Sequence, residues 1–309
     1  MGGDGCLGNL FGRNSGDPIV RAFRGTISRY HVLCRVPVSL AAAGSALTGA
    51  LLSPSRSALL PAVLTLGVFL LACGASALNQ VQEQDLDARM DRTRSRPLPS
   101  GTMSVRHALA TSILLLLVGL VFVSAGGIVP AALGAAAIVW YNGVYTLLKR
   151  RSPFAALTGA CTGAIPPIMG WTAGGGSFMD PKIFAVAALF FLWQIPHVSL
   201  HQLSSDDLTK AGLPSLSGVI PRDRLVLHAL LWTATTAIAV LSLPLLRITT
   251  TPAAGIGLLA LALWLTAKGM VIFRLRADAA VFPSAFRRIN IFIALVMALV
   301  CLESILGRS

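Results

Sequence analysis

Stretches of about 20 apolar residues recur along the whole chain, and short polar segments separate them. A helix needs about 20 mostly apolar residues to cross the hydrocarbon core of a bilayer, because each residue advances it by about 1.5 Å. The pattern therefore predicts an all-α fold, a polytopic membrane bundle of nine transmembrane helices. The predicted spans are 28–52, 59–80, 107–124, 128–148, 154–173, 182–201, 226–245, 253–272 and 289–306.

The composition supports a membrane protein and excludes a soluble domain. Of the 309 residues, 55% are hydrophobic and only 12% are charged, whereas about 25% are charged in typical soluble domains. Five cysteines lie far apart, with no CxxC pair, so the sequence predicts neither a disulfide framework nor a thiolate metal site. A net charge of +13 is also found in proteins that bind nucleic acid, but the positions of the basic residues indicate membrane topology instead.

Lysines and arginines gather in alternate connecting segments, as the positive-inside rule requires of cytosolic loops. We therefore expect no nucleic acid partner and read the charge as a topology signal. One side of the membrane receives the basic residues of segments 13–35, 89–106, 149–151, 210–224 and 268–288, and the other receives only Arg56, Lys182, Arg247 and Arg308.

This asymmetry predicts an integral multi-pass protein of a bacterial cell (inner) membrane, with the N-terminus cytosolic and the C-terminus periplasmic. Residues 1–27 lack the continuous apolar stretch of a signal peptide and are predicted to form a cytosolic tail. Residues 28–306 are predicted to form one transmembrane domain.

The segment 77–101, at the cytosolic end of the second span, holds four of the twelve acidic residues. Asn79, Glu83 and Asp87 are spaced i, i+4 and i+8, so a continuous helix would place them on one face. Oxygen ligands of this kind bind Mg²⁺, which often shares them with the phosphates of a substrate. Arg92 and Arg96 follow and can supply counter-charge to those phosphates. The alternative is a solvated charged loop that caps a membrane helix.

A second acidic pair, Asp206 and Asp207, follows the sixth span on the same side of the membrane. The pair can hold a second Mg²⁺, although the sequence SSDD is also typical of a helix N-cap. His197 and His201 precede it at i, i+4 spacing, and we expect His197 to contact an acceptor substrate. The alternative for both histidines is an interfacial position satisfied by water or headgroups.

Three further basic residues are candidates for contact with a substrate. Lys149 and Arg150 end the fourth span, shortly after Tyr145, although the positive-inside rule alone accounts for basic residues there. Arg35 lies inside the first span, where a charge costs up to about 2.5–3.5 kcal/mol. A buried anion explains its presence, and so does a side chain that reaches the membrane surface.

At these residues the chain resembles the UbiA superfamily of intramembrane prenyltransferases, whose first motif is N-x-x-x-D-x-x-x-D and whose second acidic motif follows the sixth helix. Asn79, Glu83 and Asp87 occupy the first motif, with Glu in place of the middle Asp. Within the superfamily, the heme O synthase branch is indicated by DLDARMDRTRSRPLP (85–99), YTLLKRRSPFAALTGACTGAIPPIMGW (145–171), and FLWQIPH followed by AGLPSL. The resemblance covers residues 28–300.

The resemblance implies a Mg²⁺-dependent enzyme that transfers the farnesyl group of farnesyl diphosphate to a vinyl group of heme b. It implies contact with the lipid bilayer and a possible partnership with heme A synthase or a terminal oxidase. The implied metal ligands are Asn79, Glu83, Asp87, Asp206 and Asp207, with Arg92 joining the first three in catalysis. The implied substrate contacts are Arg35, Arg96, Tyr145, Lys149, Arg150 and His197.

Two other functions stay open at this point. One is a prenyltransferase of the same superfamily that acts on an aromatic quinone or chlorophyll precursor, since it would use the same metal motifs. The other is an ion-coupled transporter, because carboxylates in a polytopic bundle often bind ions. Transporters place such groups near the bilayer midplane, whereas these lie at the cytosolic ends of helices.

Overall fold

The computed structural model describes residues 18–55, 57–274 and 280–307, and within these ranges all regular structure is helical. The helices are α1 (Pro18–Leu33), α2 (Val36–Leu52), α3 (Leu59–Gln82), α4 (Gln84–Asp87), α5 (Val105–Ser124), α6 (Ile128–Ile138), the π-helix η1 (Val139–Tyr145), α7 (Thr146–Leu148), α8 (Ala155–Ala173), α9 (Pro181–Ser204), α10 (Asp207–Lys210), α11 (Leu216–Val219), α12 (Arg222–Val240), α13 (Ser242–Leu245), α14 (Pro252–Arg274) and α15 (Val281–Leu306).

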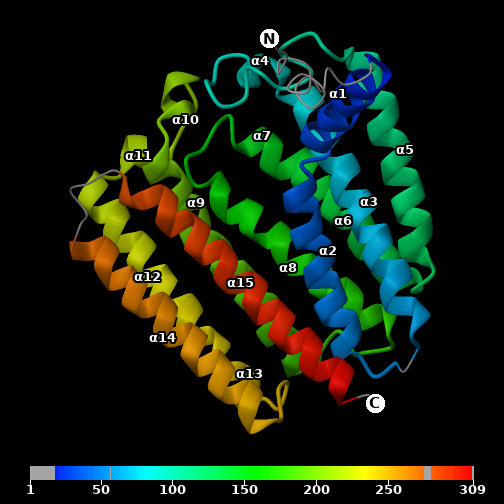
Figure 1. The fold of residues 1–309 in the computed structure, drawn as a ribbon, viewed down its shortest axis with the longest axis vertical. Helices are drawn as coiled ribbons and strands as arrows, with labels where there is room; N and C mark the ends of the chain where they lie inside the picture. Colours follow the sequence, from blue (N-terminus) through cyan, green and yellow to red (C-terminus); the bar gives the residue numbers. More distant parts are fainter. Residues whose placement is uncertain (1–17, 56, 275–279, 308–309) are drawn as a thin grey trace, which may run out of the picture.

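The long helices form a bundle in which neighbours along the chain also pack side by side (Figure 1). α2, α3, α5, α6 and α8 make one half, and α9, α12, α14 and α15 make the other. α8 packs against α9, and α15 returns to α2, so the two halves close into one body. The short helices α4, α10 and α11 lie together at one end of the bundle, and α13 lies at the opposite end (Figure 1).

Apolar side chains cover the outside of the bundle as well as its interior. Leu114, Leu117 and Val121 on α5 are exposed, and Ile238 and Leu263 are exposed on the other half. So large an apolar surface is unfavourable in water but favourable in contact with lipid tails. A helix also satisfies its own backbone hydrogen-bonding groups within a bilayer. The exterior therefore agrees with the predicted membrane bundle.

Each of the nine predicted spans coincides with a helix or a run of consecutive helices. Within the described ranges, seven helices are long and apolar enough to cross a membrane, and the bent pair Gly25–Leu33 and Val36–Leu52 makes an eighth. α8 is not among them, which fits its place inside the bundle, where it packs against α2, α6 and α9 rather than relying on lipid. The predicted number of nine spans is therefore approximate.

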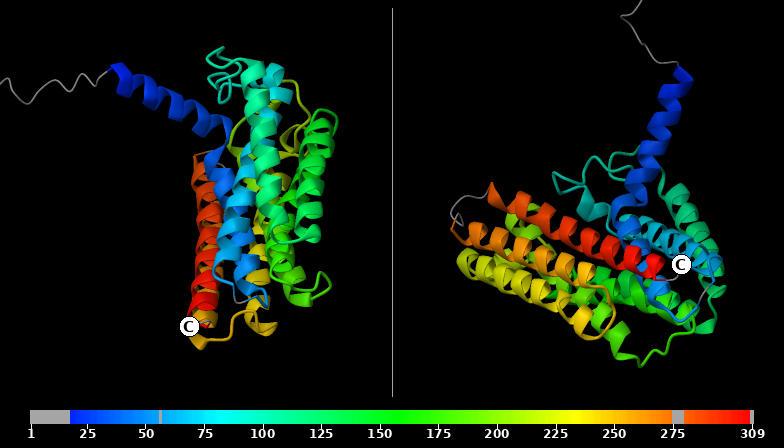
Figure 2. Two further views of the ribbon diagram at one scale, coloured as in Figure 1. Left: turned by 90° about the vertical axis from the view of Figure 1, so that its right-hand side faces the viewer. Right: turned by 60° about the horizontal axis from the view of Figure 1, so that its bottom comes forward.

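The first predicted span, 28–52, is not one straight helix. α1 and α2 are bent by 55°, and Figure 2 shows α1 projecting away from the rest of the bundle. The break is at Arg35, whose backbone is left-handed with φ 45°. That conformation costs a residue with a side chain about 1–2 kcal/mol, and Pro37 at the start of α2 helps to prevent α1 from continuing.

Glycines allow α2 and α8 to pack closely at the centre of the bundle. A Cβ atom at Gly49 would lie 1.9 Å from the carbonyl oxygen of Pro167, and one at Gly170 would lie 2.0 Å from that of Ala46. Because no side chain fits there, the two backbones meet directly. This contact fixes α8 between the two halves of the bundle.

Candidate active site

A cavity of about 190 Å³ opens between the two halves of the bundle, at the end where α4 and α10 lie. Seven of the residues predicted from the sequence line it: Arg35, Asn79, Arg92, Tyr145, Lys149, His197 and Asp207. Tyr141 and His201 also contribute to its wall. The helix break at Arg35, the C-terminal turn of α3 and the C-terminal half of α9 thus meet around one space.

The predicted row of ligands does not lie on one continuous helix. α3 ends at Gln82, the chain turns at Glu83 with φ −109° and ψ 15°, and α4 begins at Gln84. Helix-like backbone hydrogen bonds continue across the turn. The N–H of Glu83 donates to the carbonyl of Asn79, and the N–H of Asp87 donates to the carbonyl of Glu83. Asn79, Glu83 and Asp87 are all buried, at 3%, 2% and 1% exposure.

The two buried carboxylates of this segment are each paired with a cation. Lys149 donates to both carboxylate oxygens of Glu83, at 3.1 and 3.0 Å, and Arg96 donates to Oδ2 of Asp87 at 2.6 Å. Buried charges of this kind are retained only when they are paired, since the cost of removing an ion from water is several kcal/mol. The amide of Asn79 donates to the hydroxyl of Thr146 at 3.0 Å.

Asp87 keeps one oxygen free, and this oxygen makes the segment suitable for a metal ion. Its Oδ1 is buried and has no hydrogen-bond partner among the described residues. Such an atom costs about 1–3 kcal/mol unless something else binds it. Carboxylate and amide oxygens are the ligands that Mg²⁺ prefers, so the donor set of Asn79, Glu83 and Asp87 fits this ion. Among the described residues, no three His, Cys, Asp or Glu side chains already converge on one point.

The second acidic pair is divided between the cavity and the solvent. Asp207 lines the cavity, and its Oδ2 lies 3.6 Å from Nε of Arg92. Asp206 is exposed and immediately precedes α10. Lys210 donates to Asp91 at 3.1 Å, which joins the same two segments a second time. The two acidic segments predicted to face one compartment are therefore brought together over the cavity.

Positive charge accumulates on the part of the cavity wall that holds Arg35, Arg92 and Lys149, here called the cationic side. Nη1 of Arg35 donates to the hydroxyl of Tyr141 at 3.2 Å, and Tyr141 stacks on Tyr145. The pKa of Arg92 is lowered because burial disfavours the charged guanidinium and because Arg96 and Arg35 add like charge nearby. A polyanion between these side chains would relieve that repulsion, and bidentate guanidinium contacts are well suited to phosphate oxygens.

The part of the cavity wall that α9 contributes, here called the aromatic side, holds His197 and His201, and the rings of Trp193 and Phe286 pack against them. His197 lies between the rings of Trp193 and Phe286, with centroid distances of 5.0 and 4.6 Å. Its Nδ1 is 2.8 Å from Oδ1 of Asn290 on α15. His201, one turn further along α9, has an edge contact with Phe286. This side suits a flat, largely apolar ligand.

Arg150 lies apart from the cavity. It donates to both oxygens of Asp85, at 3.0 and 3.2 Å, and to the carbonyl of Gln82 at 2.6 Å, and the pair is largely exposed. Burial alone would raise the pKa of Asp85, but the hydrogen bonds and charge of Arg150 outweigh it, and the pKa is lowered. The pair fastens the end of α3 to the segment after α7.

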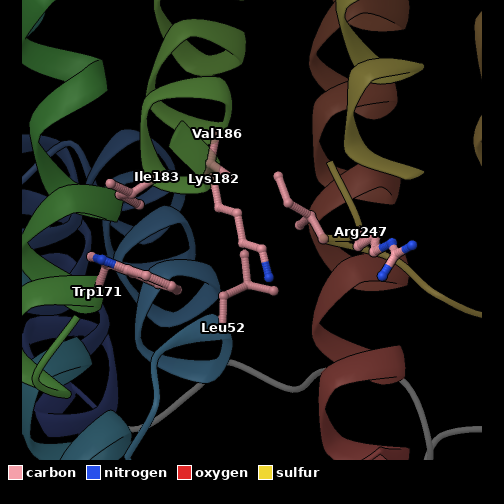
Figure 3. A pocket seen from close by; sticks show the side chains of 7 residues that line it. Leu52, Trp171, Lys182, Ile183, Val186 and Arg247 are labelled. Carbon is pink, nitrogen blue, oxygen red and sulfur yellow. The ribbon is translucent and has the colours of Figure 1, made fainter. Parts of the chain in front are cut away.

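A smaller cavity of about 70 Å³ lies at the other end of the bundle (Figure 3). Trp171, Ile183 and Val186 contribute to its wall, together with Lys182 and Arg247. In Figure 3 the amine of Lys182 lies beside Leu52, whereas the guanidinium of Arg247 points away from the other labelled side chains. Its lining residues include no carboxylate, so it does not offer the ligands that the predicted chemistry requires.

Sequence reasoning missed the residues that hold the predicted ones in place, above all Asn290 and Thr146. Asn290 lies within the last apolar stretch, where an amide needs a hydrogen-bond partner in the bundle. That signal identifies it as important but cannot name His197, which is 93 positions away, as its partner.

This bundle and its cavity are the features of an intramembrane prenyltransferase. The model of the UbiA prenyltransferase family matches residues 39–296, and the chain belongs to that family.

Among its curated relatives, the protoheme IX farnesyltransferase of Geobacter sulfurreducens is 44% identical over 214 residues, which are 69% of this chain and 79% of that one. The protoheme IX farnesyltransferase of Nitratidesulfovibrio vulgaris is 41% identical over 223 residues, 72% of this chain and 78% of the relative.

Solved structures share the fold at low sequence identity. A structure of digeranylgeranylglyceryl phosphate synthase matches with a TM-score of 0.70 and 16% identity, over 90% of this chain and 98% of that one. A UbiA homologue from Archaeoglobus fulgidus bound to GPP and Mg²⁺ matches with a TM-score of 0.60 and 17% identity, over 88% and 99% of the two chains. These likenesses establish the UbiA-like helical fold.

Proposed function

We propose that this chain transfers the farnesyl group of farnesyl diphosphate to a vinyl group of heme b, giving heme O and diphosphate. The observation that carries the proposal is the match, at 41–44% identity over more than two thirds of the chain, to relatives named protoheme IX farnesyltransferase. The cavity supports it, because its wall holds cations suited to a diphosphate and also the imidazole of His197, which packs against aromatic rings and suits a porphyrin.

On the cationic side, Arg35, Arg92 and Lys149 would bind the diphosphate of the donor, and Tyr145 would flank it. Arg96 would act through Asp87, whose orientation it fixes. We propose that Asn79, Glu83 and Asp87 hold Mg²⁺, with Asp207 and Asp206 near a second ion. The ion would supply positive charge to the leaving diphosphate, a contribution that grows as the allylic C–O bond breaks.

The ion pairs of this side suggest how the donor is accepted. Lys149 and Arg92 are each paired with a carboxylate. Because both cations also line the cavity, they lie where they would contact the diphosphate of the donor.

On the aromatic side, His197 would contact the porphyrin of heme b, and Trp193 and Phe286 would hold its ring in place. The contact Lys210–Asp91 holds together the two segments that roof the cavity. A roof limits the access of bulk water to the carbocation that forms when the C–O bond breaks.

We further propose that the cavity opens at the cytosolic face of a bacterial inner membrane, because basic residues gather at this end. The N-terminal tail, 1–27, would then be cytosolic, residues 28–306 would form the prenyltransferase domain, and the C-terminus would be periplasmic. Reporter fusions after Arg150 should read as cytosolic and fusions at Gly126 as periplasmic. The opposite result at both sites would reverse the orientation. A heme A synthase or terminal oxidase would be the downstream consumer of heme O.

Pigment analysis tests the proposed reaction. The chain is expressed in cells that lack their own heme O synthase, and the hemes are extracted and separated. We expect heme O to appear with the wild-type chain and not with an Asp87→Ala variant that still inserts in the membrane. Heme b alone, together with a newly prenylated quinone precursor, would instead assign the alternative acceptor.

A further inference from the structure

The hydrogen bonds of Asn290 determine which nitrogen of His197 carries its proton. Nδ2 of Asn290 donates to the carbonyl oxygen of Phe286 at 2.9 Å, and that oxygen can only accept. Oδ1 of Asn290 is therefore the atom that faces Nδ1 of His197, at 2.8 Å. An amide oxygen accepts, so Nδ1 must be the donor. Neutral His197 then has an unprotonated Nε2 with a free lone pair.

Packing fixes the ring as firmly as the hydrogen bond does. Trp193 and Phe286 contact it from two directions, and Nε1 of Trp193 donates to the carbonyl of Ile289 at 3.0 Å. These contacts tie α9 to consecutive residues of α15. His197 lines the cavity, and Nε2 has no hydrogen-bond partner in the described part of the chain. The structure thus presents an oriented imidazole at the cavity, with Nε2 available to a ligand.

The other basic groups around the cavity are engaged or less firmly held. Asp207 and Glu83 are paired with Arg92 and Lys149, and Asp87 is paired with Arg96. A carboxylate that already neutralises a cation is a weaker proton acceptor. His201 has ring contacts but no hydrogen bond among the described residues that would select one tautomer. His197 is therefore the group best prepared to take a proton.

We propose that Nε2 of His197 accepts the proton of the water that completes the reaction, and that Asn290 is the positioning residue that keeps this nitrogen unprotonated. The inference rests on the proposed function. In that reaction the C–O bond to diphosphate breaks and a bond forms between the farnesyl carbon and the terminal vinyl carbon. This leaves a cation at the inner vinyl carbon. Water oxygen bonds to that carbon, and one water proton passes to Nε2, so no electron is gained or lost.

Single-turnover rates of heme O formation, measured from pH 5 to 9, test the proposal on purified full-length protein with heme b and farnesyl diphosphate. The wild-type rate should fall about tenfold per pH unit at acid pH, where His197 becomes protonated. His197→Gln should lose this acid limb and be slower by about 10²–10⁴-fold at neutral pH. The other charged or titratable groups near His197 are Arg35 and His201, which also line the cavity, and His228, which contacts Ser199 on α9. His201→Gln and Ser199→Ala are therefore the controls, and both variants should keep the fall in rate at acid pH.

Asn290→Asp separates positioning from a purely structural role. A carboxylate still accepts from Nδ1, but it also stabilises the imidazolium and raises the pKa of His197. The base is then protonated at higher pH, so the acid limb should move up by about one unit or more. Asn290→Leu, which removes the acceptor, should slow the reaction at every pH.

The outcomes are distinguishable from failure of the proposed function. If the wild-type chain forms no heme O, the proposed function is wrong. If it forms heme O but the acid limb persists unchanged in His197→Gln, or stays in place in Asn290→Asp, then His197 is not the base and the inference is overturned. Should His197→Gln fail to fold, the position of the limb in Asn290→Asp decides alone.

Discussion

The two sides of the cavity are held together by different forces. On the side of α3 and α4, buried carboxylates and cations neutralise one another, as in Glu83–Lys149 and Asp87–Arg96. On the side of α9 and α15, His197 is fixed by an amide and two aromatic rings. The first arrangement can exchange its partners for a charged ligand, whereas the second holds one shape without net charge. We therefore assign the diphosphate to the first and the flat acceptor to the second.

The largest expected effect comes from removing Asp87. Asp87→Ala leaves Arg96 buried without a partner and removes a proposed metal ligand, so activity should be lost. Breaking a buried pair typically destabilises a protein by about 3–5 kcal/mol. Heme O formation and thermal unfolding of the detergent-purified protein measure the two effects. Asp223→Ala, which removes an exposed carboxylate at the start of α12, is the control and should leave both nearly unchanged. Wild-type turnover in Asp87→Ala would remove this residue from the site.

A smaller effect is expected at Arg35, and it should be confined to the donor. Arg35→Met keeps a long side chain at the helix break but removes a charge-assisted contact worth about 1.5–3 kcal/mol. Binding of a non-hydrolysable farnesyl diphosphate analogue should weaken by about 10–100-fold. Heme b binding, followed by its absorption band, should stay the same. Arg94→Met, at an exposed position, provides the control. Equal loss for both ligands would mean that Arg35 supports the cavity as a whole.

The reciprocal change is His197→Ala. It removes a ring from the aromatic side, so the affinity for heme b should fall by about tenfold while the affinity for the farnesyl diphosphate analogue is nearly unchanged. The same pair of titrations measures both. If heme b binds as tightly as to the wild-type chain, the aromatic side is not where the acceptor lies.

The smallest effect is expected at the exposed pair of Asp85 and Arg150. Arg150→Gln should lower the free energy of unfolding by no more than about 1 kcal/mol, because solvent screens the pair. Since the pKa of Asp85 is lowered in the folded chain, the contribution is present above the carboxyl's unfolded pKa and is lost as the pH falls through the folded one. Thermal unfolding at pH 7 and pH 3 should show a larger difference between variant and wild type at pH 7 than at pH 3. A difference of equal size at both values would rule out this electrostatic origin.

The bundle could be predicted from the sequence because each membrane helix is recognisable from its own run of apolar residues. The charged segments were also found, since acids are rare in this chain and gather in few places. The turn at Glu83 was not found, because the residues around it favour a helix and nothing local marks the end of α3. The break between α1 and α2 was not predicted either, because an arginine rarely adopts the left-handed conformation that Arg35 has there.

Partners across the bundle were beyond the reach of the sequence. Lys149 is 66 residues from Glu83, and Asn290 is 93 residues from His197. Such pairs form because helix packing sets the register between helices, as in the glycine contacts of α2 on α8 and the side-chain packing of α9 on α15. A pattern read along one helix cannot supply that register. The chemistry of the site was therefore predictable, whereas its electrostatic balance required the structure.

One measurement tests the central claim most directly. Purified protein is incubated with heme b, labelled farnesyl diphosphate and Mg²⁺, and the extracted heme is analysed by mass spectrometry, with a parallel reaction in which a chelator removes the metal. We predict a labelled heme that exceeds heme b by one farnesyl group and one hydroxyl group, formed only when Mg²⁺ is present. Unmodified heme b, with the label released as farnesol or attached to another lipid, would contradict the account.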